Sequence, residues 1–144
     1  MMLRAANQRV RVAAQAVSWL ATPYHHHGRV KGVGVDCANL LCAVYHEAGV
    51  IGNIDPGFYP HDWHLHHNDE LFIQWVERTG AHSVEKPMTG DVALFRFGRT
   101  FSHGAVMISA ETIVHAYLEM GVILSRLDEH PVAGRAVQFW SLWK

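Results

Sequence analysis

Cys37, His103 and His115 are the residues whose types and spacing could support covalent catalysis. Cys37 directly follows Asp36, at the start of a segment whose apolar residues recur with helical spacing as far as position 48. A thiol at a helix N-terminus lies at the positive end of the helix dipole, so the sequence predicts a lowered pKa and a thiolate near neutral pH. Such a nucleophile needs a base that takes the thiol proton and later returns it to the leaving amine.

Two histidines in the second half of the chain are candidates for the base and its partner. His103 and His115 lie twelve residues apart, in apolar segments typical of two strands joined by a short hairpin. Because neighbouring strands share a face, we expect the two imidazoles to meet across them. His103 would then act as base, and His115 as the polar group that fixes its tautomer and ring orientation. Either histidine alone is more typical of a satisfied strand residue, but the joint spacing favours a site.

The elements that must position these side chains change character along the chain. Helical periodicity covers residues 5–20 and the cysteine segment, which Gly49 ends, and a third helix is expected from Asn68 or Asp69 to Thr79. Residues 22–35 and 50–68 are typical of loops. About five strands are then expected at 92–97, 103–109, 112–118, 122–127 and 136–142. This order predicts a single α+β domain over residues 1–144, with helices packed on one side of an antiparallel sheet.

Composition excludes several classes of partner. The net charge is −1 with histidines neutral, and Lys and Arg form no run, which argues against nucleic acid and against an anionic membrane surface. The N-terminus has no long apolar stretch, so we expect neither a signal peptide nor a membrane span. The two cysteines, Cys37 and Cys42, point to different sides of the predicted helix, so a disulfide between them is not expected. Cys42 lacks a cap and partners and is predicted to be a core residue.

Histidine is the compositional outlier, with 12 in 144 residues. Two clusters stand out, His25-His26-His27 and the set His61, His64, His66 and His67. A structural zinc site needs defined ligand spacing and supporting partners, and neither is recognisable here. We therefore expect no metal and no cofactor, and interpret the clusters as polar, substrate-facing loops whose charge rises below about pH 6.5.

Four segments carry a resemblance to a known family: Asp36–Leu40, Gly90–Phe95, Ser102–Ile108 and Val114–Ala116. Together they resemble the NlpC family of papain-like cell-wall cysteine peptidases, over roughly residues 10–120. The order of cysteine, histidine and polar third residue agrees, and so does the spacing of the histidines. Thr22-Pro23-Tyr24 matches the family's tyrosine upstream of the cysteine, whose hydroxyl faces the active site. Ala38 and Asn39 depart from the family, which usually has Ser or Leu and then Gly at these positions.

The resemblance implies a papain-like fold and a metal-free hydrolysis of amide bonds in peptidoglycan stem peptides. Cys37 would be the nucleophile, His103 the base and then acid, and His115 the orienting residue. Tyr24 would place a hydroxyl at the substrate. Asp36 would support the oxyanion site as the cap of the helix whose first N–H, that of Cys37, donates to the oxyanion.

Stand-alone members of the family without a signal peptide resemble those encoded with bacteriophage or prophage tail genes. The resemblance thus implies synthesis in the cytoplasm, phage tail proteins as partners, and action from the virion tail in the periplasm or cell wall. Two alternatives stay open on the residues alone. One is an acyltransferase or amidase that uses the same thioester chemistry, and the other is a catalytically silent tail-assembly module. The sequence leaves the cleaved bond and the oligomeric state undefined.

Overall fold

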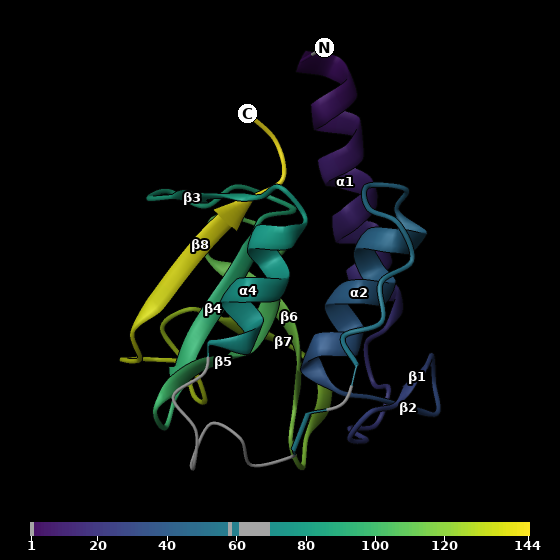
Figure 1. Cartoon of the computed structure of the whole chain (residues 1–144), viewed down its shortest axis with the longest axis vertical. Helices are drawn as coiled ribbons and strands as arrows, with labels where there is room; N and C mark the ends of the chain where they lie inside the picture. Colours follow the sequence, from purple (N-terminus) through teal and green to yellow (C-terminus); the bar gives the residue numbers. More distant parts are fainter. Residues whose placement is uncertain (1, 58, 61–69) are drawn as a thin grey trace.

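Helices pack against an antiparallel sheet in the computed structural model of the chain, which describes residues 2–57, 59, 60 and 70–144 (Figure 1). Within these residues the helices are α1 (Met2–Ser18), α2 (Cys37–Glu47) and α4 (Leu71–Arg78). The sheet has six strands in the order β3-β8-β4-β5-β6-β7, and every neighbouring pair is antiparallel. Their bounds are β3 (His82–Val84), β4 (Val92–Phe97), β5 (Thr100–Met107), β6 (Thr112–Tyr117), β7 (Gly121–Arg126) and β8 (Val137–Ser141). The predicted α+β class is confirmed.

The sheet has one strand more than the five expected. The additional strand, β3, pairs with β8 at the sheet edge, and its three residues are too short and too polar to give a strand pattern in the sequence. The segment 22–35, expected to be a loop, also contains a small hairpin of β1 (Arg29–Val30) and β2 (Gly34–Val35). Both corrections concern strands of two or three residues, for which alternation cannot be recognised.

The third helix begins later than the sequence suggested. α4 starts at Leu71, and Glu70 occupies its N-cap position without a capping side-chain hydrogen bond. The Glu70 carboxylate instead accepts the backbone N–H of Phe101 at 2.8 Å, which ties the start of α4 to β5. The predicted caps, Asn68 and Asp69, lie outside the described residues. None of the described helices has the length and apolar character needed to cross a membrane.

α2 and α4 approach the sheet closely at β5. A Cβ built on Gly104 would lie 2.5 Å from Cζ of Phe72 on α4 and 3.1 Å from Cδ2 of Leu41 on α2. Glycine at this position therefore lets both helices pack on the strand. Because side chains alternate along β5, His103 is directed to the opposite face, where its cross-strand partner is Phe95. α2, the helix that begins at Cys37, thus packs directly against β5, the strand that carries His103.

Candidate active site

Cys37, a half-buried residue, is the first residue of α2, and its thiol lies against the backbone of β5. Sγ donates a hydrogen bond to the carbonyl oxygen of Ser102 at 3.7 Å, and the N–H of Gly104 also faces the sulfur. These two backbone groups immediately precede and follow His103 in the chain. The structure therefore brings the predicted nucleophile to the part of β5 that carries the predicted base.

Asp36 caps α2, as the sequence predicts, and is almost completely buried, with 1% of its surface exposed. Its Oδ1 accepts the backbone N–H of Asn39 at 2.9 Å and the side-chain amide of Asn39 at 3.0 Å. Its Oδ2 accepts the backbone N–H of His27 at 2.8 Å and the hydroxyl of Tyr59. Four donors therefore satisfy an almost completely buried carboxylate, which holds the residues around Cys37 together.

The predicted lowering of the Cys37 pKa is wrong for the resting protein. Burial of the sulfur, and secondly the charge of Asp36, raise the pKa of the thiol to about 12. Backbone N–H groups of Gly104, Ala38 and Cys37 itself lower the pKa, but by less. The loss of hydration and the neighbouring carboxylate thus outweigh the dipole of the first helical turn. The resting side chain is a thiol, so its proton has to be removed as it reacts.

The two histidines form one end of a buried hydrogen-bonded chain. Nε2 of His103 lies 2.7 Å from Nδ1 of His115, and Nε2 of His115 lies 2.8 Å from Oγ of Ser125 on β7. The predicted meeting of the two imidazoles across neighbouring strands is confirmed. Ser125 carried no signal in the sequence, because its partnership with His115 depends on the register of β6 and β7.

Both imidazoles are neutral at neutral pH. Burial, followed by electrostatic interaction with His115 and Arg135, holds the pKa of His103 well below its usual range. Burial lowers the pKa of His115 to about 4. A neutral imidazole can accept a proton, and Nδ1 of His103 takes part in none of the hydrogen bonds among the described residues. That nitrogen is the one available to a base.

Two tyrosines lie near the thiol, of which the sequence indicated one. The backbone of Tyr24 forms an isolated bridge with Val35, next to the cap of α2. Burial, followed by electrostatic interaction with Cys37 and Asp36, raises the pKa of Tyr24. The Tyr24 hydroxyl is therefore close enough to both residues to interact with them electrostatically. Burial, Asp36 and Cys37 raise the pKa of Tyr59 in the same way. The sequence did not indicate Tyr59, because it belongs to an irregular segment. Only the tertiary structure places this segment beside Asp36, the N-cap residue of α2.

Two members of the first histidine cluster, His26 and His27, pack around Tyr59. The ring of His27 stacks on that of Tyr59, with centroids 4.5 Å apart, and Nε2 of His27 lies 3.0 Å from the Tyr59 carbonyl oxygen. His26 meets both rings edge-on. These residues therefore help to hold Tyr59 beside Asp36. His61, His64, His66 and His67 lie outside the described residues.

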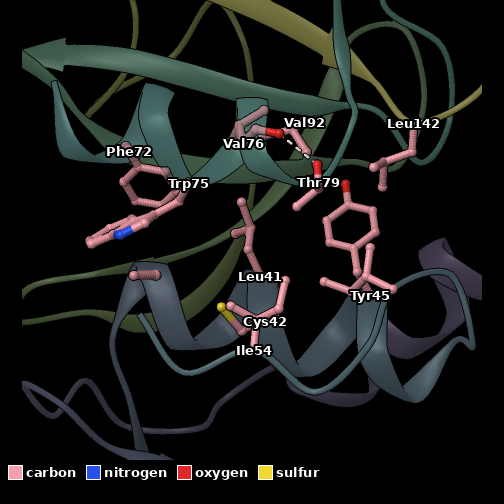
Figure 2. Close-up of a pocket in the computed structure, with 12 residues that line it drawn as sticks. Leu41, Cys42, Tyr45, Ile54, Phe72, Trp75, Val76, Thr79, Val92 and Leu142 are labelled. Atoms are coloured by element: carbon pink, nitrogen blue, oxygen red, sulfur yellow. Dashed lines mark hydrogen bonds between the residues drawn. The ribbon is translucent and has the colours of Figure 1, made fainter. Parts of the chain in front are cut away.

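A separate apolar pocket lies between α2 and α4 (Figure 2). It has a volume of about 480 Å³ including its open mouth, and Leu41, Cys42, Phe72 and Trp75 are among its lining residues. Its hydroxyls are already bonded, since Thr79 donates to the Val76 carbonyl at 2.6 Å and Tyr45 to the Gly90 carbonyl at 2.7 Å. Cys42 thus lines a pocket, where the sequence suggested a core position. Burial raises the pKa of its thiol to about 11, and the described part of the chain leaves both cysteines free.

A cysteine that starts a helix, packed on an antiparallel sheet whose strands carry two joined histidines, defines a protein of the papain-like class. The profile described as the NlpC/P60 family matches residues 21–141, and the chain belongs to that family. No curated protein gives a match to the chain.

Solved structures share the fold, and two of them illustrate the likeness. The NlpC/p60 domain of the peptidoglycan hydrolase SagA has a TM-score of 0.61 and 17% identity, and the match covers 90% of this chain and 96% of that one. An NlpC/P60 family protein from Bacillus cereus ATCC 10987 has a TM-score of 0.59 and 19% identity. There the match covers 90% of this chain and 39% of the other, so this chain corresponds to one part of that protein.

Proposed function

We propose that the protein is a cysteine peptidase that hydrolyses amide bonds in peptidoglycan stem peptides. Cys37 is the nucleophile, His103 the base and then acid, and His115 the orienting residue. Two observations support the proposal. The thiol lies against the backbone on either side of His103, and Nε2 of His103 lies 2.7 Å from Nδ1 of His115. Family membership and the likeness to a domain of a peptidoglycan hydrolase support the substrate class.

The resting protonation states determine how the first step proceeds. As Sγ of Cys37 attacks the scissile carbonyl carbon, its proton passes to Nδ1 of His103, since neither group is charged beforehand. The C–N bond then breaks, and the leaving amine takes that proton. Water attacks the resulting thioester while Nδ1 accepts a proton from it. As the C–S bond breaks, that proton passes from Nδ1 to the sulfur, which restores the thiol and the neutral imidazole.

The developing oxyanion needs donors that are in place before the reaction. The backbone N–H of Cys37 is at the free N-terminus of α2, where helical N–H groups have no partner within the helix. The hydroxyl of Tyr24 is the second donor in the proposal, which its electrostatic proximity to Cys37 supports. Asp36 contributes by fixing the first turn, because its oxygens are occupied by protein donors.

The decisive experiment incubates purified peptidoglycan with the wild-type protein and with the variants Cys37→Ala and Cys42→Ala. We expect mass analysis to show new stem-peptide fragments with the wild type and with Cys42→Ala. Cys37→Ala should reduce their rate of formation by at least about a thousandfold. Full activity of Cys37→Ala would show that Cys37 is not the nucleophile. A wild-type protein that releases no fragments would favour the alternative of a catalytically silent tail-assembly module.

Two further arms of the same experiment separate related chemistries. EDTA should leave the rate unchanged, and a loss of activity would indicate a metal-dependent reaction. When a small amine is added, we expect the products still to be those of hydrolysis, with water as the acyl acceptor. An amide between the acyl group and the added amine would identify an acyltransferase. A place in a phage tail stays a prediction, which the detection of the chain in purified virions would test.

A further inference from the structure

We propose that Oγ of Ser125 accepts the Nε2–H of His115, which makes Ser125 a positioning residue that favours the productive tautomers of His115 and His103. The inference rests on the proposed function, because it concerns the base of the same site. Ser125 lies on β7, two strands away from the strand of His103, and its side-chain hydrogen bond is to His115. It acts through His115 alone.

The register of the sheet brings Ser125 to His115. Ile123 lies directly opposite His115 in the β6–β7 pair, and Ser125 is two residues further along β7, on the same face. Oγ of Ser125 lies 2.8 Å from Nε2 of His115. His115 is fully buried and Ser125 is 4% exposed, so water is not an easy substitute for this contact.

The two contacts of His115 couple its tautomer to that of His103. A neutral imidazole has one N–H and one acceptor nitrogen. If Ser125 accepts from Nε2–H of His115, then Nδ1 of His115 is an acceptor and must receive Nε2–H of His103. Nδ1 of His103 then has a free lone pair, as a base for the Cys37 thiol requires. The opposite arrangement places the proton of His103 on Nδ1, where it cannot accept another.

Removal of the hydroxyl therefore has a chemical as well as a structural consequence. In Ser125→Ala, Nε2 of His115 loses its acceptor, and the preference for the productive pair of tautomers weakens. We expect kcat to fall about three- to tenfold with little change in KM, the equivalent of one neutral hydrogen bond. Ser125→Thr retains the hydroxyl on a β-branched residue suited to a strand and should recover most of the rate. Ser141→Ala is the matched control, because Ser141 is also a buried strand serine but bonds to Trp143 and Arg9.

Measurement of the histidine tautomers distinguishes this positioning role from a purely structural one. Imidazole ¹⁵N shifts of the wild-type protein should show the proton of His115 and that of His103 on Nε2 near neutral pH. In Ser125→Ala the Nδ1–H form of His103 should appear, and in Ser125→Thr and Ser141→Ala it should not. A wild-type protein with the His115 proton on Nδ1, or unchanged tautomers in Ser125→Ala, would overturn the inference. Because this readout needs no substrate, it stays decisive even if peptidoglycan is not cleaved.

Discussion

The side-chain amide of Asn39 donates a hydrogen bond to Oδ1 of Asp36 at 3.0 Å, the same oxygen that accepts the backbone N–H of Asn39. The amide also lies 3.4 Å from the hydroxyl of Tyr59, which itself donates to Asp36. Position 39 is where the chain departs from the glycine usual in the family it resembles. The departure adds a donor to a buried carboxylate, and so links the cap of α2 to the segment that carries Tyr59.

Asn39→Ala should lower the free energy of unfolding by about 1–2 kcal/mol, because two buried side-chain contacts are lost while the backbone cap remains. Alanine keeps helix propensity high, so the loss reports on those contacts. Urea denaturation monitored by tryptophan fluorescence would measure it. Asn53→Ala is the control, since Asn53 is exposed and bonds only to Arg29 among the described residues. A variant as stable as the wild type would show that the amide contributes nothing to the cap.

The resting protein should show slow alkylation at Cys37. The pKa of this thiol is about 12 and that of Cys42 about 11, so at pH 7 iodoacetamide should label Cys37 no faster than Cys42. The thiolate fraction, and with it the rate, should rise about tenfold per pH unit above neutrality. Mass spectrometry of both cysteines against pH would measure these rates. A plateau in the Cys37 rate below pH 7 would instead reveal a preformed thiolate–imidazolium pair.

Asp36→Asn should accelerate the alkylation of Cys37, because the carboxylate is the second cause of the raised pKa. Asparagine can still cap a helix, so the first turn is expected to persist with reduced stability. The rate in a Cys42→Ala background at a fixed pH near 8 isolates the effect on one thiol. A rate equal to that of Cys42→Ala alone would mean that burial accounts for the whole shift.

The sequence predicts the helices and long strands because their patterns are local. The apolar spacing of α2 and the glycine that follows it, at φ 77°, define that helix before any contact is known. β4 occurs at the predicted bounds, Val92–Phe97. β3 and the β1–β2 hairpin were missed because two or three residues form a strand only when a partner supplies its hydrogen bonds.

The residues of the candidate site divide in the same way between local and tertiary signals. Cys37, His103 and His115 are found by residue type and spacing, and Asp36 by its position before a helix. Ser125, Tyr59 and the backbone N–H of His27 come from other parts of the chain, and only the tertiary structure places them beside His115 and Asp36. The pKa of Cys37 was predicted in the wrong direction for a related reason: the helix dipole is a local property, whereas burial of the sulfur by β5 is not.

Tyr24→Phe should lower kcat on the order of tenfold to a hundredfold and leave KM nearly unchanged, if its hydroxyl donates to the oxyanion. The ring and its packing are retained, so the melting temperature should change little. Steady-state kinetics on a purified stem peptide would measure both constants. Tyr45→Phe is the control, because that hydroxyl donates to the Gly90 carbonyl in the core and its loss should reduce stability but not kcat. Equal kcat values for Tyr24→Phe and wild type would remove Tyr24 from the mechanism.

The protein should lose stability as the pH falls below the ordinary histidine pKa of 6.5. The folded pKa of His103 lies well below that value and the folded pKa of His115 is about 4, so both bind protons more weakly folded than unfolded. The unfolded chain therefore takes up more protons between about pH 6.5 and 4, and the stabilisation by neutral histidines, complete above pH 6.5, declines through that interval.

Each histidine can contribute a slope of up to about 1.4 kcal/mol per pH unit, less where the unfolded form is only partly protonated. Urea denaturation at pH 7, 6, 5 and 4.5 would measure the free energy of unfolding of the wild type and of His115→Asn. Asparagine does not titrate, so the variant should be less stable at pH 7 but should lose stability less steeply toward pH 4.5. Parallel curves for the two proteins would show that His115 is protonated equally easily in the folded and unfolded states, against the burial that the His103–His115–Ser125 chain requires.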